Sequence, residues 1–173
     1  MNDKLNTLKI TIPYSYAKTS VPVNWSDISL AISNSIFDPD AAIEHAVNEV
    51  EKRDFVPQSV LELALLSLDD VSIFAISQHL NTLTETVSKQ ELNQSKTKLL
   101  YLLLKWVYDN KEQYCDPLGV VECIYDDFGF PESIVDFVRY MPMQGLDLGS
   151  TERNLRRLYS RWKRFLDDQH VFW

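Results

Sequence analysis

Apolar residues recur at intervals of three and four along most of the chain, which is the period of an amphipathic α-helix. The first clear case is the series Ile28, Ala31, Ile32 and Ile36. Ser26 precedes this series and is the expected N-cap. Residues 60–68 are apolar on most sides and predict a central helix, and residues 99–108 are apolar nearly all round and predict a buried one. We therefore predict an all-α protein of stacked helical hairpins.

Two further helices complete this pattern. Asp69 or Asp70 is expected to open a helix that carries Val71, Phe74, Ala75, Gln78 and Leu83. The last helix has the clearest stripe of all, and Thr151 is its expected cap. Its stripe consists of Leu155, Leu158, Tyr159, Trp162, Phe165 and Leu166. This spacing predicts that one face of the last helix is buried.

Four segments share a helix-start pattern, in which a proline precedes an apolar pair at its third and fourth following positions and an acid at its fifth. These starts are Pro39, Pro57, Pro117 and Pro131. Proline suits the first helical position because the amide that it lacks has no intrahelical acceptor there. Asp38 and Asp116 stand just before two of these prolines and are expected to cap their helices. The unequal intervals of 18, 60 and 14 residues exclude a fixed-period repeat.

Two segments depart from helical periodicity. Residues 8–16 alternate between apolar and polar, which predicts a short strand or an extended arm, and Pro13 limits a strand there to a sheet edge. Residues 84–98 are polar and form the best candidate for a sub-boundary within a single helical domain of residues 1–173. Ser88 and Glu91 also form a capping box, so the alternative is an exposed first turn of a helix.

Composition narrows the class of protein. The 173 residues are 45% hydrophobic and 24% charged, with 7 prolines and 4 glycines, which fits a globular helical domain. A formal charge of -8 argues against nucleic acid and anionic membranes as partners. The apolar run 99–104 is too short for a membrane span, and residues 1–12 contain no secretory signal. Two cysteines provide neither a disulfide framework nor a zinc site, so we expect reduced thiols in the cytoplasm.

A specific resemblance runs through the second half of the chain. The residues that carry it are Lys105-Trp106, Asp116-Pro117-Leu118, the runs 121–128, 130–134 and 136–142, and Arg161-Trp162. These residues resemble the bacterial family catalogued as domain of unknown function 2247. Trp25-Ser26-Asp27-Ile28, the segment 57–62 and Asp69-Asp70 also fit, so the resemblance extends from about Trp25 onward, with residues 125–142 as its most specific part. It implies a compact bacterial protein and no particular activity, and small acidic proteins of this kind include toxin-neutralising immunity proteins.

The same stretch contains most of the candidate chemistry. Glu122 and Asp126 are four residues apart on one predicted helix, Glu132 and Asp136 repeat the spacing on the next, and Asp127 lies at the turn between them. Paired carboxylates on two helices are one arrangement that binds Mg²⁺ or Mn²⁺. The alternative is that these carboxylates are solvated or ion-paired, which is the more frequent situation on helix surfaces.

Arg139 follows these carboxylates and is expected to pair bidentately with Asp126, Asp127 or Asp136, which would lock the two helices together. The other interpretation is that Arg139 binds a phosphate or a carboxylate of a partner. The neighbouring aromatic residues are Tyr125, Phe128, Phe130, Phe137 and Tyr140. Such residues usually lie in the core or at its rim, and an exposed subset would form an anchor patch for a partner.

The last helix is basic, since residues 152–168 have a net charge of +3. Its arginines at helical spacing are Arg153, Arg157, Arg161 and Arg164. We expect them to lie against an acidic body, with nucleic-acid binding as the alternative. The remaining candidates for chemistry are His45, His79, His170, Cys115, Cys123, Gly119, Gly129, Gly145 and Gly149. They form no zinc motif, phosphate-binding loop or nucleophile elbow, which excludes the common nucleotide-binding and hydrolase classes.

The sequence therefore favours a protein–protein interaction module, such as an immunity protein that covers a basic toxin, with no cofactor and no metal. The predicted partner-binding residues are Glu122, Tyr125, Asp126, Asp127, Arg139 and Tyr140. The alternative is a metal-dependent hydrolase whose ligands would be Glu122, Asp126, Glu132 and Asp136. The two hypotheses differ in geometry, because a metal site requires these carboxylates to converge.

Overall fold

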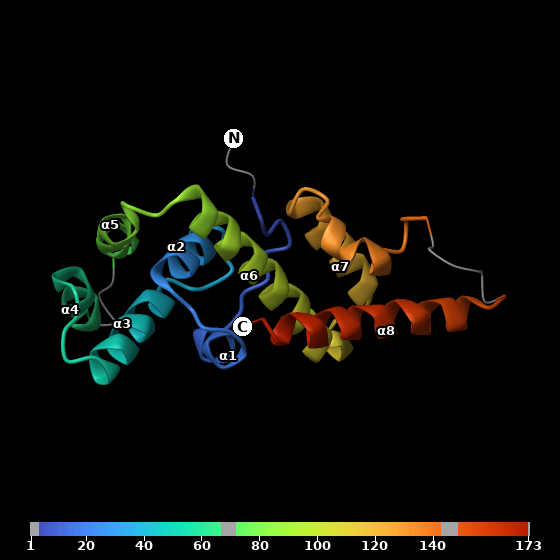
Figure 1. Cartoon of the computed structure of the whole chain (residues 1–173), viewed down its shortest axis with the longest axis horizontal. Coiled ribbons are helices and arrows are strands. Elements are labelled where there is room, and N and C mark those ends of the chain that lie inside the picture. The colour runs from blue at the N-terminus through green and yellow to red at the C-terminus, as the bar shows by residue number, and fades with distance from the viewer. Residues whose placement is uncertain (1–3, 67–71, 143–148, 173) are drawn as a thin grey trace. The chain divides into compact units, whose positions relative to one another are not determined.

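The computed structural model describes residues 4–66, 72–142 and 149–172, and this part of the chain contains helices and no strand (Figure 1). The helices are α1 (Tyr14–Ser20), α2 (Trp25–Ser33), α3 (Asp40–Lys52), α4 (Gln58–Ala64), α5 (Ile73–Thr84), α6 (Lys89–Asp109), the 3-10 helix η1 (Lys111–Gln113), α7 (Pro117–Asp127), the 3-10 helix η2 (Glu132–Phe137) and α8 (Thr151–His170). The prediction of an all-α protein is confirmed.

The chain divides into two compact units, and the division falls inside α6. Residues 9–99 form the N-terminal unit, and residues 1–8 together with 100–173 form the C-terminal unit. The polar segment 84–98 lies just before this division. It contains the end of α5 and the first turns of α6. There the Glu91 side chain accepts hydrogen bonds from the backbone and hydroxyl of Ser88, and the Glu91 amide donates to the Ser88 hydroxyl. This is the predicted capping box.

The N-terminal unit is built from consecutive helix pairs. α2 packs against α3, α3 against α4 and α4 against α5, while α1 also contacts α3 and α5 contacts α2. The fully buried residues of this unit include Ala17, Ile28, Ala31, Ile36, Ala42, Ala46, Val60 and Leu63. These contacts agree with the predicted stacking of helical hairpins.

The helix predicted over residues 60–68 is observed only in part, and residues 67 and 68 lie outside the described residues. α4 ends at Ala64, and it buries only Val60 and Leu63 among its side chains. Leu61 is 39% exposed, and Leu65, which follows the helix, is 85% exposed. A seven-residue helix has only two turns, so it can bury one narrow stripe and leaves its other apolar side chains in contact with solvent.

The segment 8–16 forms no strand. Residues 9–13 lack regular secondary structure, and Tyr14 already begins α1. Ile10 and Ile12 are buried, and the Ile12 amide donates to the carbonyl oxygen of Ile36. The apolar positions of the alternation therefore insert into the helical core of the N-terminal unit, where no neighbouring strand is described.

Several helix starts differ from the predicted caps. The Asn24 side chain caps α2 and forms a capping box with Asp27, so the assignment of this role to Ser26 is wrong. Ser150, one residue before Thr151, caps α8. Ser72 caps α5, while Asp69, Asp70 and Val71 lie outside the described residues. The side chain of Asp116 caps α7 directly before Pro117, as predicted. Pro39, Pro57 and Pro131 each stand one position before the first helical residue, and Asp38 accepts from Ala41 through its carbonyl oxygen.

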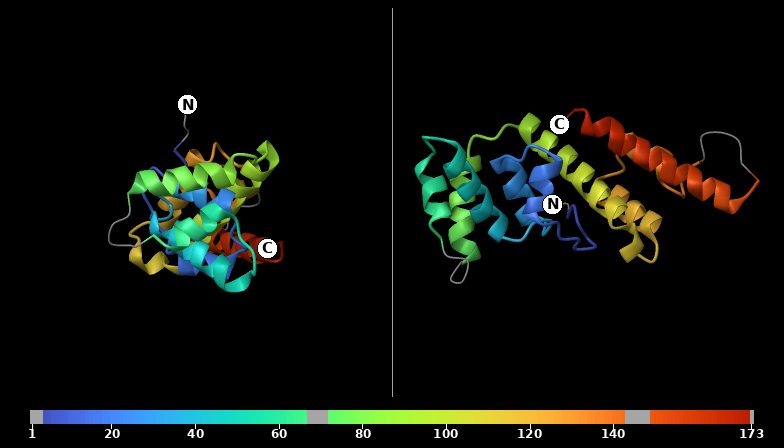
Figure 2. Two further views of the ribbon diagram at one scale, coloured as in Figure 1. Left: turned by 90° about the vertical axis from the view of Figure 1, so that its left-hand side faces the viewer. Right: turned by 90° about the horizontal axis from the view of Figure 1, so that it is seen from below.

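The C-terminal unit is organised around Trp162, which is fully buried on α8. The indole of Trp162 stacks parallel to the ring of Phe137 from η2, with 6.1 Å between centroids, and meets the edge of Tyr108 from α6 at 5.1 Å. Leu158 and Leu166 are buried one turn to either side of Trp162, as the predicted stripe requires, whereas Leu155 at the start of that stripe is 36% exposed. The views agree that α6 and α8 run in opposite directions (Figures 1 and 2). α8 also packs against η2, where the Phe137 ring contacts both Trp162 and Phe165 of α8.

Candidate functional site

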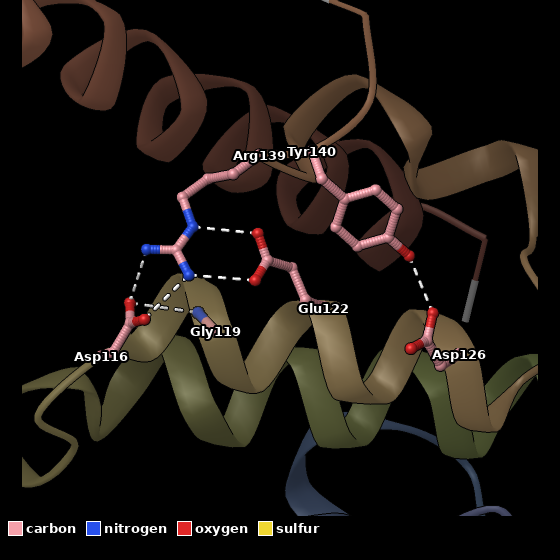
Figure 3. Close-up of polar contacts among 6 residues, drawn as sticks. All are labelled: Asp116, Gly119, Glu122, Asp126, Arg139 and Tyr140. Carbon is pink, nitrogen blue, oxygen red and sulfur yellow. Dashed lines mark hydrogen bonds and ion pairs between the residues drawn. The ribbon is translucent and has the colours of Figure 1, made fainter.

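The candidate site lies on the exposed face of α7 and on the segment that follows η2. α7 begins where the Asp116 side chain accepts a hydrogen bond from the Gly119 amide at 3.1 Å. The buried face of α7 consists of Leu118, Val121, Ile124 and Tyr125. The helical period consequently leaves Asp116, Glu122 and Asp126 along the other face, where residues 139 and 140 run beside them (Figure 3).

Arg139 binds two of these carboxylates at once (Figure 3). Its Nε and Nη2 donate to the two oxygens of Glu122 at 2.9 and 3.0 Å. Its Nη1 and Nη2 also donate to the two oxygens of Asp116 at 3.0 and 2.8 Å. We call Asp116, Glu122 and Arg139 the Arg139 clamp. Two bidentate contacts fix the guanidinium in its plane and position, which a single ion pair would not do.

The clamp corrects the predicted pairing of Arg139. Asp126, Asp127 and Asp136 were the expected partners, whereas the observed partners are Asp116 and Glu122. Hydrogen bonds from Arg139 hold the pKa of the Asp116 carboxyl below its usual range, and the bonds to Glu122 and then to Asp116 raise the pKa of the guanidinium. Both shifts favour the charged forms of Asp116 and Arg139 at neutral pH.

Gly119 makes the clamp possible, although its isolated position in the sequence gave no reason to select it. A Cβ atom at residue 119 would lie 2.5 Å from Oδ2 of Asp116 and 3.3 Å from Nη2 of Arg139. The first distance is shorter than any real contact, so a larger residue would displace the Asp116 carboxylate. The proximity of Gly to an N-capping aspartate was the only available signal, and it does not identify the distant arginine.

Tyr140 forms the next contact along the same face of α7. Its hydroxyl donates to Oδ1 of Asp126 at 2.7 Å, while its ring is 54% exposed (Figure 3). Burial of the hydroxyl and this hydrogen bond raise the pKa of Tyr140 to about 12, so the hydroxyl remains a donor. The ring meets that of the buried Tyr125 at 6.0 Å. Arg139 and Asp126 thus hold the Tyr140 ring at the surface from two sides.

Phe130 extends this aromatic cluster and has an unusual backbone. Its ring packs edge-on against Tyr125 at 5.3 Å, yet the residue is 61% exposed. Its φ angle is +62°, directly after Gly129 at +71°. The left-handed region is unfavourable for a bulky side chain. Phe130 and Tyr140 are therefore an exposed subset of the aromatic residues, whereas Tyr125 and Phe137 are buried.

The other predicted site residues are already occupied or lie apart. Asp127 accepts hydrogen bonds from the backbone amide and hydroxyl of Thr7, at 2.8 and 3.0 Å, and so links Thr7 to the end of α7. Glu132 and Asp136 lie on η2, which is a 3-10 helix. Residues four apart do not stack in a 3-10 helix, because three residues complete each turn. Glu132 and Asp136 therefore do not share one face of a helix, as had been predicted.

The geometry gives no support to a metal or thiol site in this region. Residues 4–66, 72–142 and 149–172 contain no group of three or more histidine, cysteine, aspartate or glutamate side chains that could hold a metal ion. Burial and the carboxylates of Asp127, Asp126 and Glu122 raise the pKa of the Cys123 thiol, which disfavours the nucleophilic thiolate. Cys115 is exposed and unbridged.

The histidines and the basic face of α8 lie elsewhere. His45 is buried beside Tyr14 in the N-terminal unit, His79 faces Glu62, and His170 is exposed at the end of α8. The described ion pairs of α8 are Arg156 with Glu152 and Lys163 with Asp167, both within the helix. Arg161 of α8 donates to the backbone oxygen of Asp136 in η2. The basic helix therefore neutralises itself in part.

Comparison with known families matches residues 14–170 to a family described as an uncharacterized protein conserved in bacteria, DUF2247. The chain belongs to the DUF2247 family. The match contains the whole of α7, the Arg139 clamp and the Phe130–Tyr140 cluster. Neither the curated proteins nor the solved structures include a match to this DUF2247 member. Within the described helices, none is long and apolar enough to cross a bilayer.

Proposed function

We propose that this DUF2247 protein is a protein–protein interaction module that binds a basic partner through Phe130, Tyr140 and the acidic residues around them, as an immunity protein would bind a basic toxin. We call Asp126, Phe130 and Tyr140 the aromatic patch. The single observation that carries the proposal is the exposed phenylalanine at a positive φ angle. Aromatic side chains of this kind are the usual energetic centres of protein interfaces.

The backbone of Phe130 supports this interpretation because it costs stability without burying the side chain. A non-glycine residue in the left-handed region costs roughly 1–2 kcal/mol, and asparagine or glycine would avoid much of this cost. The amide of Phe130 donates to the carbonyl oxygen of Tyr125 at 2.9 Å, which holds the turn in this conformation. Strain of this kind is concentrated at functional positions. The turn therefore presents a large apolar ring to solvent at a net cost to folding.

The charges around the aromatic patch favour a basic partner. Residues 109–140 contain eight carboxylates against two cations, Lys111 and Arg139, and the whole chain carries -8. Asp126, Glu132 and Asp136 are exposed. A negative surface accelerates encounter with a positive protein and gives an association rate that falls with salt. The same charge opposes nucleic acid as the partner.

The Arg139 clamp has a positioning role in this proposal. Because its guanidinium is already occupied by Asp116 and Glu122, Arg139 holds residue 140 in register with Asp126. Glu122 and Arg139 then contribute to the interface through this geometry, whereas Tyr140 and Phe130 would contact the partner. Two unbridged cysteines support a cytoplasmic location for the complex.

The test compares two exposed phenylalanines with a partner captured from the source bacterium, identified and purified. Phe130→Asn removes the ring from the patch with a residue that accepts a positive φ. Phe55→Asn is the matched control, because Phe55 is 93% exposed in the other unit. We expect Phe130→Asn to weaken the dissociation constant at least about 30-fold, as for an interface hot spot, and Phe55→Asn to leave it unchanged. Equal effects of the two substitutions would refute the assigned surface.

The stability of Phe130→Asn must be measured together with its binding. Relief of backbone strain offsets the lost contact with Tyr125, so Phe130→Asn should leave the free energy of unfolding within about 1 kcal/mol of wild type. The association rate should fall at least about tenfold from low to physiological ionic strength. A rate insensitive to salt would exclude electrostatic steering.

The immunity role has its own readout. The partner expressed alone in a bacterial host should stop growth, and wild-type protein should restore growth while Phe130→Asn should not. A partner that binds through the patch but is harmless would retain the interaction module and refute immunity.

A further inference from the structure

The helices of residues 4–66, 72–142 and 149–172 differ in charge, and α5 is the one among them without aspartate, glutamate, lysine or arginine. It lies in the N-terminal unit beside α2 and α4, at the edge of the helix stack (Figure 1). Its buried residues are Ile76 and Leu80. The exposed side of a surface helix ordinarily carries charged residues. A helix of 12 residues without any, in a chain with a formal charge of -8, therefore presents an unusual surface.

The side of α5 opposite Ile76 and Leu80 is exposed. Phe74, Gln78 and Thr82 follow one another along it at intervals of four, and Asn81 lies beside Thr82. Phe74 is 70% exposed. We call this surface the α5 face, and it consists of Phe74, Gln78, Asn81 and Thr82. The α5 face therefore combines an aromatic ring at one end with polar, uncharged side chains along the rest.

The polar side chains of α5 depend little on solvent. The hydroxyl of Thr82 donates to the carbonyl oxygen of Gln78 at 3.2 Å, and that of Ser77 donates to the carbonyl oxygen of Ile73 at 2.8 Å. Both hydroxyls keep these bonds when another surface displaces the water around them, so covering them costs little. Gln78 and Asn81 each carry an amide, which offers a donor and an acceptor and can pair with an identical amide. The α5 face is therefore complementary to itself.

Charge identifies what would cover this face. The basic partner proposed for the aromatic patch gains no electrostatic attraction from an uncharged helix. Amphipathic helices that lie on membranes are typically rich in lysine and arginine on their polar side, and α5 carries neither. A second copy of the chain brings the same charge of -8, so two copies repel each other where acidic surfaces meet, and least where neither surface is charged. The α5 face meets this condition for a second copy.

We propose that two copies of this protein associate through their α5 faces, with the helices antiparallel about a twofold axis at Gln78. Gln78 then meets Gln78 of the second copy, and Phe74 packs against Thr82 of the second copy, because these two positions lie four residues to either side of the axis. Glu85, which follows α5, lies at opposite ends of the helix pair in the two copies. The dimer uses no residue of the aromatic patch or the Arg139 clamp, and it is independent of the proposed function.

Sedimentation equilibrium of the full chain at low and physiological ionic strength tests the dimer. A helix of 12 residues is about 18 Å long, so the contact is small and we expect a dissociation constant in the micromolar range. Salt screens the repulsion between two acidic chains, so the dimer should tighten at least about threefold at the higher ionic strength. Binding of the basic partner has the opposite salt dependence.

Three results would overturn the dimer. One is a protein that stays monomeric up to about 1 mM, and another is a dimer that weakens with salt. The third concerns the other occupant of an uncharged face with an aromatic ring, which is lipid. Monomers that bind phosphatidylcholine vesicles, and lose this binding in Phe74→Ser, would assign the α5 face to a lipid surface.

Substitutions at Gln78 test the axis itself. Gln78→Glu and Gln78→Lys each place two like charges opposite one another, so each should weaken self-association at least about tenfold. An equimolar mixture of the two variants should dimerise more tightly than either variant alone, because opposite charges then face each other across the axis. A mixture that is no tighter than the separate variants would overturn the inference.

Gln90→Glu and Gln90→Lys are the matched controls, because Gln90 is an exposed glutamine in the first turn of α6 and belongs to the same unit. They change the net charge equally and should leave self-association unchanged, alone and mixed. Controls that act as strongly as the Gln78 variants would refute the α5 face as the interface. Phe130→Asn should leave the dimer intact, so a failure of the dimer and a failure of the proposed function are separate results.

Discussion

Each unit of this protein contains a basic side chain paired with carboxylates, and the two groups differ in their exposure to solvent. In the N-terminal unit, Lys98 donates to Oδ2 of Asp27 at 2.5 Å and to the carbonyl oxygen of Pro22 at 2.8 Å, with both charged side chains almost fully buried. In the C-terminal unit, Arg139 binds Asp116 and Glu122 while a third of the arginine side chain and half of Asp116 remain exposed.

The two groups differ in what they contribute to the stability of the fold. A buried pair has lost its hydration, so removal of one partner leaves an uncompensated charge in the core. An exposed pair keeps water as an alternative partner, and its net contribution to stability is small. The Lys98–Asp27 pair therefore secures the packing of α2 against α6, whereas the Arg139 clamp fixes the position of a surface aromatic residue at little energetic cost.

The largest expected effect comes from Lys98→Met, which removes the buried cation and keeps most of the volume. Asp27 would remain buried with one of its oxygens, Oδ1, already without a partner in the described structure. We expect the free energy of unfolding in urea to fall by about 3–5 kcal/mol. The double variant with Asp27→Asn removes both charges and should be less destabilised than Lys98→Met alone. A double variant that is at least as unstable would contradict the role of the unpaired charge.

The next effect is expected from Gly119→Ala, at the centre of the clamp. Alanine in place of a helical glycine usually stabilises by about 0.5–1 kcal/mol. Here the new Cβ would lie 2.5 Å from the Asp116 carboxylate, so we expect a loss of about 1–3 kcal/mol in a denaturant titration. In the background of Asp116→Ala the obstacle is gone, and the same substitution should become stabilising. An unchanged sign in that background would refute the steric explanation.

This second case also shows where sequence patterns stop being informative. Capping depends on residues three or four apart, so Ser88 with Glu91 and Asp116 with Pro117 could be predicted. The partners of Arg139 could not, because they depend on how the 3-10 turn η2 returns the chain to α7, 17 and 23 residues away. The prediction chose the carboxylates that are nearer to Arg139 in the sequence, and it was wrong.

Burial was the other quantity that the local pattern did not determine. The Lys98–Asp27 pair joins residues 71 positions apart, and nothing in either local sequence marks it. Residues 60–68 and 99–108 are both largely apolar in sequence, but the described part of the first segment buries only Val60 and Leu63, whereas most of the second lies in the core. A run of apolar residues specifies that a helix prefers burial, while the number of neighbouring elements decides whether it is buried.

A smaller effect, visible as a pH dependence, is expected at His45 in the N-terminal unit. Burial lowers the pKa of His45, whose Nδ1 shares a hydrogen bond of 2.7 Å with the hydroxyl of Tyr14. A folded-state pKa below the unfolded value of about 6.5 means that the unfolded chain binds the proton more readily. Stability from this group is therefore complete above pH 6.5 and is lost as the pH falls below it.

His45→Gln removes that titration. We expect the wild-type free energy of unfolding to decline between pH 7 and pH 5 by at most about 1.4 kcal/mol per pH unit, and the variant to decline less. His79→Gln is the control, because His79 is partly exposed beside Glu62. Parallel curves for wild type and His45→Gln would show that another group governs the acid side.

The smallest expected effect comes from the exposed Arg139 clamp. As with His45, the stability that it contributes decreases as the pH falls, but the cause is a lowered carboxyl pKa. The hydrogen bonds from Arg139 lower the pKa of Asp116, so its contribution is complete above the unfolded value of about 3.9 and disappears as the pH falls through the folded value. Asp116→Asn should cost about 0.5–1 kcal/mol at pH 7, and wild type and variant should converge once the pH lies below the folded pKa of Asp116. A difference in the free energy of unfolding that persists below this pKa would mean that Asp116 acts through its shape as a cap. Asparagine would then destabilise the protein for a reason other than the missing charge.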